Sequence, residues 1–450
     1  MEVRVFSWFA HALAAVAIAP GHAPAREIVL HNFGCPPKGG NPYTGVIRDS
    51  AGNFYGTTGD GGTADKGVVY KLDATGHQTV LHSFSGGSDG DSPAAGVIRD
   101  SAGNLYGTTT VGGTAGQGVV YKLDKTGRYT VLHNFRGGAD GRQPYAGVIH
   151  DSAGNLYGTT SSGGTGKSGV VYKLDTAGHE RVLYSFTGGA DGDEPLAGVI
   201  RDSAGNLYGT TSFGGTPCTP VVQGQPPSCG VVYRLDAAGH YTVLYRFTGG
   251  ADGGIPYAGV IRDSAGNLYG TTYAGGTAGC NGTAGCGVVY KLDASGHESV
   301  LCSFNGYDGA LPFAGVIRDS AGNLYGTTAG GGGPFGDGQG VIYKLDPAGN
   351  ITVLYNFPGG ANGGDAFAGV IRDSAGNLYG TTFFGGTADA GLVYKLDPAG
   401  NYTVLYSFPG RVNRGNPYAG VIRDPAGNLF GTTYYGGDSN RGVVFELTPQ

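Results

Sequence analysis

Charge is scarce in this 450-residue chain: Asp, Glu, Lys and Arg make up 14% of the residues, and the formal net charge is −6. No basic patch or charged tail stands out, which argues against a nucleic-acid partner. The histidines do not cluster, which argues against a transition-metal site. The glycine-rich stretches lack the lysine of a phosphate-binding loop and precede no predicted helix, which argues against nucleotide binding. We therefore expect no metal, no cofactor and no catalytic residues.

Long apolar runs are missing except for one near the N-terminus. It extends from Val5 to about Ala19, contains His11, and is shorter than the roughly twenty residues that a membrane-spanning helix needs. Ala23-Pro24-Ala25 then provides a small-residue cleavage site. We predict that residues 1–25 are a signal peptide and that the mature chain is secreted or extracellular, with the periplasm or the cell surface as alternatives. We expect no membrane span in the mature chain, which should be monomeric.

Cysteines number only six, and four of them fall in two pairs. Cys218 and Cys229 bracket one insertion, and Cys280 and Cys286 bracket another. Zinc binding is the alternative, but no histidine lies near either pair and the spacing is not of the C-x₂-C type. In an oxidising compartment each pair is expected to form a local disulfide. Cys35 and Cys302 lie in distant parts of the sequence and are not expected to pair.

One repeated unit dominates the sequence. Glycine accounts for 91 residues, and there are 29 tyrosines and 19 phenylalanines. The segment AGVIRDSAGNLYGTT at 95–109 recurs letter for letter at 197–211, 258–272, 314–328 and 368–382, with near copies at 44–58, 146–160 and 419–433. Counted from the glycine, the units begin at Gly45, Gly96, Gly147, Gly198, Gly259, Gly315, Gly369 and Gly420. A period near fifty residues is typical of a propeller blade.

Each unit contains four strand signals, which in the second unit are residues 96–99, 105–109, 119–123 and 130–135. They are rich in β-branched and aromatic residues and are separated by turn residues such as Asp and Gly. A single sheet of this size cannot cover both of its faces, whereas radial stacking of units does. A β-helix is the alternative, although its rungs are usually much shorter than this unit.

The two ends of the sequence are out of phase by one strand. Residues 28–33 match a fourth strand with no unit before it, and residues 442–447 match a third strand with no fourth after it. The two remainders complete one blade. We therefore predict an all-β fold in which residues 26–450 form an eight-bladed β-propeller with four antiparallel strands per blade. Residues 26–34 should close the last blade, which begins at Gly420.

The repeated motifs resemble those of a known family. GVIRDSAGNLYGTT, the double glycine, GVVYKL and the DG-x-x-P loop together resemble the gloeo/verruco (GloVer) tandem repeat of exported bacterial proteins. The strand rhythm is also similar to that of NHL-type propellers. The resemblance covers essentially the whole mature chain and implies export and a repeat architecture. It implies no catalytic residues.

The units differ in length only in the loops between second and third strands and between fourth and first strands. Because successive strands alternate in direction, these loops share one face of a propeller, and the remaining turns share the other. The insertions between Thr216 and Gly230 and between Thr277 and Gly287 are the largest. Loop variation on a constant scaffold usually marks the functional side, so we predict that this face binds the ligand.

Aromatic residues gather in the same loops. They follow the second strand in units 4, 5, 7 and 8, and others, including Tyr43, Tyr145 and Phe367, precede the first strand. The candidate ligand-binding residues are Phe213, Tyr273, Phe383, Phe384, Tyr434, Tyr435, Tyr257, Phe313 and Tyr418. Exposed aromatic rings can stack on sugars or hold apolar groups of a partner. Alternatively, these rings pack over the blade edges. We expect the four rings from units 7 and 8 to form one stacking surface.

Two further patterns have a structural interpretation. An Arg-Asp pair ends the first strand of every unit except the third, where His150 replaces the arginine. The arginines could attract an anion, but their repetition favours a bond to the neighbouring blade. Asp191, Asp193 and Glu194 form the densest acidic loop, which could hold Ca²⁺ but is interpreted as solvated.

We expect a binding or scaffold module whose unknown ligand is a glycan or a surface protein. The alternative is an extracellular hydrolase or lyase with its site at the mouth of the propeller channel.

Overall fold

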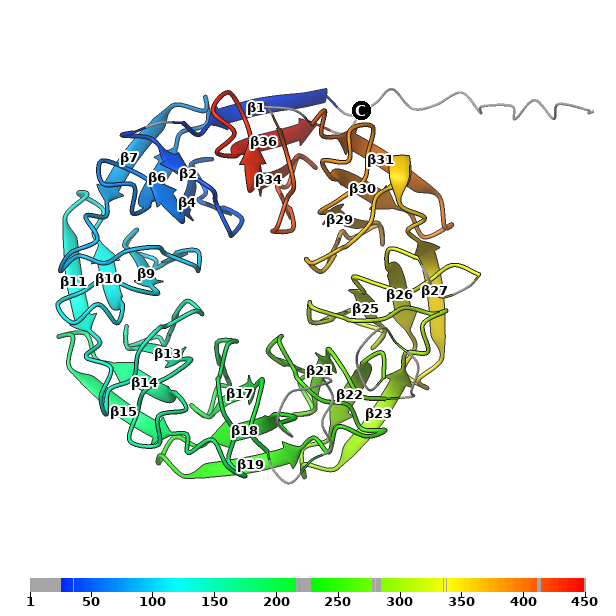
Figure 1. Ribbon diagram of the computed structural model, residues 1–450, viewed down its shortest axis with the longest axis horizontal. Helices are drawn as coiled ribbons and strands as arrows, with labels where there is room; N and C mark the ends of the chain where they lie inside the picture. Colours follow the sequence, from blue (N-terminus) through cyan, green and yellow to red (C-terminus); the bar gives the residue numbers. More distant parts are fainter. Residues whose placement is uncertain are drawn as a thin grey trace, which may run out of the picture.

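The strands of the chain form eight four-stranded antiparallel sheets. In the computed structural model these sheets surround a common axis as the blades of a closed propeller (Figure 1). The structure describes residues 26–34, 36–215, 218, 228–276, 280, 285–334, 336, 338–410 and 414–448. Within these ranges the one helical segment is a 3-10 turn, η1 (Gly360–Asn362), and no helix is long and apolar enough to cross a membrane. The predicted fold class is confirmed.

The four strands of each blade follow one another outward from the axis (Figure 1). The first strands are β3 (Ile47–Arg48), β8 (Ile98–Arg99), β12 (Ile149–His150), β16 (Ile200–Arg201), β20 (Ile261–Arg262), β24 (Ile317–Arg318), β28 (Ile371–Arg372) and β33 (Ile422–Arg423). The second strands are β4 (Phe54–Thr58), β9 (Leu105–Thr109), β13 (Leu156–Thr160), β17 (Leu207–Thr211), β21 (Leu268–Thr272), β25 (Leu324–Thr327), β29 (Leu378–Thr382) and β34 (Leu429–Thr433).

The outer half of each blade repeats as regularly. The third strands are β6 (Val68–Leu72), β10 (Val119–Leu123), β14 (Val170–Leu174), β18 (Val231–Leu235), β22 (Val288–Leu292), β26 (Val341–Leu345), β30 (Leu392–Leu396) and β36 (Val443–Thr448). The fourth strands are β7 (Gln78–Ser83), β11 (Tyr129–Asn134), β15 (Glu180–Ser185), β19 (Tyr241–Arg246), β23 (Glu298–Ser303), β27 (Ile351–Asn356), β31 (Tyr402–Ser407) and β1 (Arg26–Asn32). Two short ladders, β2 (Gly39–Gly40) with β5 (Asp60–Gly61) and β32 (Arg414–Gly415) with β35 (Tyr435–Gly436), join neighbouring loops.

The first strands are shorter than the sequence predicts. In blade 2 only Ile98 and Arg99 pair with β9, whereas the predicted strand also included Gly96 and Val97. The residues just before Ile98 contact the neighbouring blade instead. The hydroxyl of Thr57 in blade 1 donates a 3.0 Å hydrogen bond to the carbonyl of Ala95, and Val97 is buried. This segment therefore joins two blades and does not extend the ladder of one.

A buried aromatic ring on the third strand lies over a glycine on the second strand in every blade. In blade 1 the ring is Tyr70, and a Cβ atom on Gly56 would lie 2.5 Å from its hydroxyl oxygen. This close approach explains the glycine in the repeated Leu-Tyr-Gly-Thr-Thr segment. Blade 8 uses Phe445 over Gly431, so the packing needs the ring and does not need the hydroxyl.

The same contacts join successive blades and also close the ring. A phenylalanine after each fourth strand packs against the buried ring of the next blade. The last of these is Phe33, whose ring lies 5.1 Å from that of Tyr70. Thr432 donates a 3.0 Å hydrogen bond to Thr44, the closing equivalent of the Thr57 bond. β1 pairs with β36 from Arg26↔Thr448 to Asn32↔Val443. Blade 8 is therefore completed by the N-terminal strand, as predicted.

Arginine side chains bridge blades at the first–second turns. Arg318 lies over the ring of Tyr269 in the preceding blade, with its guanidinium carbon 5.6 Å from the ring centroid, and 3.9 Å from the Asp263 carboxylate. Comparable ion pairs occur at three other boundaries: Arg48 with Asp424, Arg262 with Asp202, and Arg423 with Asp373. The interblade role predicted for the arginines is confirmed at these four boundaries, although the cation–π contact was not foreseen.

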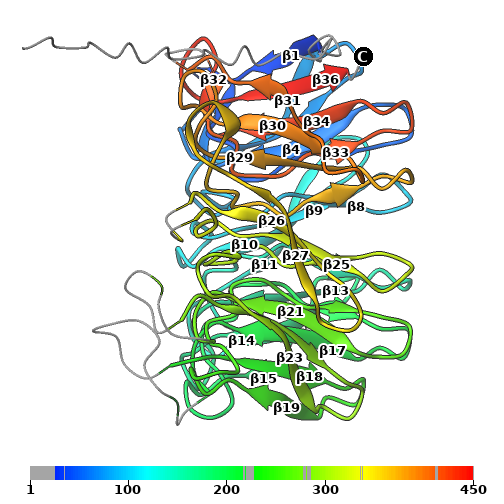
Figure 2. The same cartoon turned by 90° about the vertical axis from the view of Figure 1, so that its right-hand side faces the viewer.

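Figure 2 shows the ring from its edge, with the tight hairpin turns on the right and the longer connections on the left. We call the first side the turn face; it carries the turns between first and second and between third and fourth strands. We call the second side the loop face; it carries the connections between second and third strands and between one blade and the next. β32 and β33, which lie on opposite sides in this view, mark the two faces.

Candidate functional site

Aromatic side chains on one half of the loop face form an unbroken series of ring contacts. We call this series the aromatic arc. Its ten members are Tyr257, Tyr273, Phe313, Phe367, Phe383, Phe384, Tyr418, Tyr434, Tyr435 and Tyr43. The arc starts in blade 5, passes blades 6, 7 and 8, and ends in the loop that leads into blade 1.

The arc begins with rings packed edge to face or tilted. The centroids of Tyr257 and Tyr273 lie 5.3 Å apart, and those of Tyr273 and Phe313 lie 4.9 Å apart. Phe313 continues to Phe367 at 5.3 Å with an interplanar angle of 81°. These separations are those at which aromatic pairs attract one another. The sequence-predicted residues Tyr257, Tyr273 and Phe313 therefore lie together, and Phe367 connects them to the next blade.

Tyr418 connects the aromatic pairs of blades 7 and 8. Its ring lies 4.9 Å from Phe383 and 5.9 Å from Tyr434. Each of these rings is in turn packed against its sequence neighbour, Phe384 at 4.8 Å and Tyr435 at 4.6 Å. The predicted surface of four rings is thus a surface of five, because the connection between the blades places Tyr418 between the two pairs.

Four members of the arc remain substantially exposed. The exposed fraction is 40% for Phe384, 43% for Tyr418 and Tyr435, and 45% for Tyr43. The other members are half-buried against their neighbours. The rings therefore pack on one another along the blade edges, and the four outer rings remain exposed.

Asparagine side chains hold the backbone beneath the two aromatic pairs. The Asn416 amide donates a 2.8 Å hydrogen bond to the carbonyl of Phe383, and the Asn41 amide donates one of 3.1 Å to the carbonyl of Tyr434. Both asparagines have a left-handed backbone, with φ of 58° and 56°, which asparagine tolerates better than most residues. The Tyr434 hydroxyl also donates to the Tyr43 hydroxyl at 3.1 Å, across the closure of the ring.

Blades 2 and 3, on the opposite half of the loop face, have a small polar residue at the first of these positions. Thr110 in blade 2 donates a 2.9 Å hydrogen bond to the carbonyl of Ser92, and Ser161 in blade 3 donates one of 3.1 Å to the carbonyl of Gln143. Tyr145 on this half is 48% exposed, and the aromatic contacts of the described residues do not include it.

Phe213, the candidate from blade 4, lies outside the aromatic arc and packs against a core cluster that includes Tyr208, Cys229 and Ile255.

The predicted Cys218–Cys229 and Cys280–Cys286 disulfides are both present. Cys302 is a buried free thiol, and Cys35 lies outside the described residues. In the acidic loop that contains Asp191, the Asp191 carboxylate accepts hydrogen bonds from the Tyr184 hydroxyl and the Thr187 backbone amide. These bonds stabilise the conformation of the loop.

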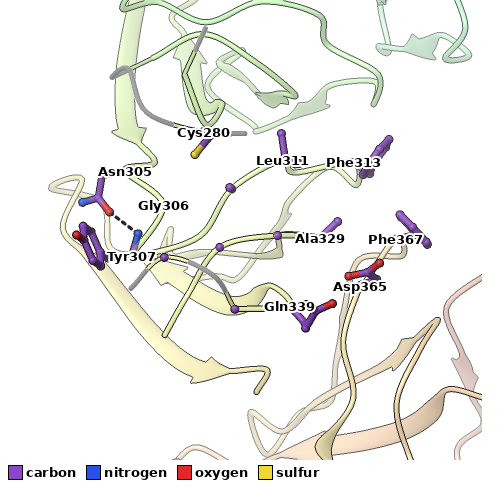
Figure 3. Close-up of a pocket in the computed structure, with 15 residues that line it drawn as sticks. Cys280, Asn305, Gly306, Tyr307, Leu311, Phe313, Ala329, Gln339, Asp365 and Phe367 are labelled. Carbon is purple, nitrogen blue, oxygen red and sulfur yellow. Dashed lines mark hydrogen bonds between the residues drawn. The ribbon is translucent and has the colours of Figure 1, made fainter. Parts of the chain in front are cut away.

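A cavity of about 560 Å³ opens beside the arc between blades 5 and 7 (Figure 3). Phe313 and Phe367 line its side toward the arc, and Tyr307 lies at the other side. Asp365 contributes its carboxylate to the lining, and the carboxyl's pKa is raised by burial and by the nearby charge of Asp389. Gln339 supplies a carboxamide next to this carboxylate. The cavity therefore combines aromatic walls with a few polar groups, as small-molecule sites do.

The sequence matches one repeat family along nearly its whole length. Three overlapping matches to the Gloeobacter/Verrucomicrobia repeat cover residues 21–223, 220–333 and 277–450. The chain belongs to this family. The predicted resemblance is thereby confirmed. No curated protein matches the chain.

Several solved structures resemble this Gloeobacter/Verrucomicrobia repeat protein distantly. A gluconolactonase from Xanthomonas campestris is 16% identical, with a TM-score of 0.31 over 62% of this chain and 79% of that chain. A putative 6-phosphogluconolactonase from Bacteroides uniformis is 15% identical, with a TM-score of 0.44 over 78% of this chain and 94% of that chain. A puromycin hydrolase is 13% identical, with a TM-score of 0.46 over 88% of this chain and 58% of that chain. Similarity at this level carries no conclusion about activity.

In this Gloeobacter/Verrucomicrobia repeat protein, the site is made of residues that differ between blades. The sequence indicated the arc residues from their positions after Thr-Thr and before the first strands, but it did not indicate the cavity. The missed signal was the pair Ala329-Gly330, which stands in blade 6 where blade 7 has Phe383-Phe384. Small residues among large ones at matched positions indicate a gap between the side chains.

Proposed function

We propose that this protein is an exported binding protein that holds a glycan against the aromatic arc. The observation that carries the proposal is the one-sided series of ten contacting rings, four of which are 40–45% exposed. Exposed aromatic residues gathered on one part of a surface usually mark a contact site. The half of the same face with Thr110 and Ser161 argues that the fold itself does not require them.

The chemistry of the arc suits a sugar better than a purely apolar partner. A pyranose presents C–H groups on its ring faces and hydroxyls around its edge. Aromatic faces can stack on the C–H groups, while tyrosine hydroxyls at Tyr43, Tyr418 and Tyr435 can bond to the edge. A series of contacting rings from blade 5 to the loop before blade 1 also suits an extended chain of sugars.

Export agrees with the disulfides. The Cys218–Cys229 and Cys280–Cys286 disulfides both close loops on this face, and disulfides persist in oxidising compartments outside the cytosol. We therefore retain residues 1–25 as a proposed signal peptide. A glycoside hydrolase commonly uses a pair of carboxyl groups, and the described lining of the cavity contains a single one, Asp365. For this reason we favour binding over hydrolysis.

The test uses residues 26–450 and a panel of soluble oligosaccharides: cellohexaose, mannohexaose, maltohexaose and N-acetylchitohexaose. Titration calorimetry should detect binding of at least one of them. Replacing Phe383, Phe384, Tyr434 and Tyr435 together by Ser, the residue at both positions in blade 3, should weaken that binding on the order of a thousandfold, since each of the four stacking contacts contributes about 1 kcal/mol. Tyr145→Ser, on the opposite half, is the matched control and should bind normally.

The melting temperature of each variant separates binding from folding. Failure of every oligosaccharide to bind, or normal binding by the fourfold variant, would refute the proposal. An unfolded fourfold variant would assign these rings a structural role.

A further inference from the structure

The cavity beside the aromatic arc exists because blade 6 departs from its neighbours in two ways. Ala329-Gly330 replaces the aromatic pairs found in blades 7 and 8, which removes side-chain volume from the loop face. The connection into blade 6 is also one residue shorter and carries Tyr307, which is 62% exposed. Together these changes leave about 560 Å³ open between Tyr307 on one side and Phe313 and Phe367 on the other (Figure 3).

Backbone hydrogen bonds fix the position of Asp365 at the edge of the cavity. Its amide donates to the Gln339 carbonyl at 2.8 Å, and its carbonyl accepts from the amides of Phe367 and Phe383, both at 3.1 Å. The residue has a φ of 53°, in the left-handed region, which sets the direction of the side chain. Its carboxylate makes no hydrogen bond or ion pair within the described parts of the chain, so both of its oxygens can accept from a ligand.

Two carboxamides add donors to the same cavity. The Gln339 side chain has no hydrogen-bond partner among the described residues, and it lies on the same side as Asp365 (Figure 3). Asn305 uses its oxygen to accept from the backbone amides of Tyr307 and Asp308, at 2.9 and 3.2 Å. Its NH₂ group remains available as a donor. The lining thus presents acceptors and donors near an aromatic wall, which is the set of groups that binds sugar hydroxyls and the apolar face of a sugar ring.

We infer that this cavity is the subsite for the terminal one or two units of the glycan, and that it selects neutral pyranoses over anionic sugars. The inference rests on the proposed function and refines it. The volume lies within the range of small-molecule sites and continues directly from the arc through Phe313 and Phe367. Asp365 is the one charged group among the described lining residues, so a uronate or sulfated sugar would bring like charges together.

The first test fills the cavity. Gly330 has an ordinary backbone conformation, and a Cβ atom there would meet its nearest neighbour, Leu311, at 3.6 Å, so a side chain fits without strain. Gly330→Phe places a ring where blade 7 has Phe384. Whichever neutral hexasaccharide of the panel binds should lose at least tenfold in affinity. An arc without a terminal subsite would instead bind the variant equally well or more tightly, because the arc gains a ring.

The second test changes the chemistry and keeps the shape. Asp365→Asn should weaken binding of the same neutral hexasaccharide at least tenfold and should improve binding of a guluronate hexamer relative to it. Glu194→Gln is the matched control, because Glu194 occupies the equivalent loop position before blade 4 with a φ of 52°. It should leave both affinities unchanged. This variant pair also keeps the proposal testable if Gly330→Phe lowers the melting temperature.

The outcomes separate the two proposals. Normal binding by Gly330→Phe and Asp365→Asn, with loss of binding in the fourfold arc variant, overturns the terminal subsite and leaves glycan binding by the arc in place. Equal affinity of the unmodified protein for the guluronate hexamer and the neutral probes also overturns the subsite. Failure of all neutral probes overturns both.

Discussion

Matched positions on the two halves of the loop face can share a backbone pairing and still carry different side chains. In blades 3 and 7 alike, the second residue after the second strand forms an antiparallel bridge with the preceding loop: Arg142↔Ser162 in one and Gly364↔Phe384 in the other. The bridge is therefore independent of the side chain that the residue carries. In blade 3 this side chain is a serine, and in blade 7 it is an aromatic ring of the arc.

This difference separates what the fold needs from what the chain adds to it. Thr110 and Ser161 donate their hydroxyls to carbonyls in the loops before their own blades, whereas Asn416 and Asn41 donate side-chain amides to the Phe383 and Tyr434 carbonyls of the preceding blades. The extra aromatic area is therefore an addition to the repeated fold, and this addition supports the proposed ligand-binding role.

Deleting residues 26–34 should have the largest effect, because it opens the closed ring to which both halves of the loop face belong. The deletion removes β1, leaves β36 with an unpaired edge, and removes Phe33, a fully buried ring. Loss of a buried phenylalanine alone costs about 3–5 kcal/mol. We expect the cooperative unfolding transition to be lost or its free energy to fall by more than about 5 kcal/mol, measured by near-ultraviolet circular dichroism during thermal and urea unfolding.

An open array of units would respond differently. Its stability would be roughly a sum over units, so loss of one terminal strand would leave the remaining blades intact. An unchanged melting temperature would contradict closure. Phe33→Ala, which keeps β1 and its ladder, should show an intermediate loss.

The ring could be predicted from the sequence because every blade uses the same residues for the same contacts. Thr57, Phe84 and Tyr121 each have counterparts around the ring, so the repeat period and the one-strand offset at the termini were sufficient. Strand ends were less predictable. Val97 looks like strand sequence, yet it lies between blades, because the carbonyl before it bonds to a neighbour that is distant in sequence.

The candidate site was only partly predictable, because parts of it depend on contacts between loops that are distant in sequence. The aromatic residues at matched positions identified most of the arc, but the part played by Tyr418 depends on how a connection crosses between two blades. The cavity depends on side chains that are absent at Ala329 and Gly330, and on carboxamides from two other loops. Convergence of this kind has no periodic signal, because each contributing residue occurs once.

The outer rim of the propeller differs between the two boundaries on either side of blade 4. At the boundary of blades 3 and 4, Tyr184 and Tyr241 stack with their centroids 3.6 Å apart. At the boundary of blades 4 and 5, Glu298 takes the place of the second tyrosine. Burial and the nearby Asp252 raise the pKa of Glu298 to about 7, and one of its carboxyl oxygens is buried without a hydrogen-bond partner among the described residues.

Glu298 should therefore make stability depend on pH. Below about pH 4 the carboxyl is protonated in both states and contributes nothing. As the pH rises through 4.5 toward 7, the unfolded chain loses the proton first, so the folded state is progressively destabilised. Glu298→Gln should then be more stable than the unmodified protein by about 1 kcal/mol at pH 8, after allowance for solvent at this half-buried site, and equally stable at pH 4.

Urea unfolding at the two pH values measures this difference. Blade 1 already has Gln78 at the same position, so the fold accepts the amide. Glu180 at the boundary of blades 2 and 3 also has a pKa raised to about 7, and Glu180→Gln should behave in the same way. A stability difference that does not change with pH would contradict the assignment.

The smallest expected effect concerns the asparagines that distinguish the aromatic half. Asn416→Ser introduces the residue that blade 2 has at this position, Ser92, whose φ of 53° is close to the 58° of Asn416, so the backbone can keep its conformation. The variant loses the 2.8 Å hydrogen bond to the Phe383 carbonyl, a loss of about 1 kcal/mol in folding free energy. Because this bond holds the strand end that carries Phe383 and Phe384, affinity for the oligosaccharide should fall several-fold in calorimetry. Gln143→Ser, at the equivalent position of the other half, should leave affinity unchanged, since only the backbone carbonyl of Gln143 accepts the bond from Ser161. If Asn416→Ser lowers stability but not affinity, the asparagines serve the fold alone, and the two halves differ in their rings but not in how those rings are held.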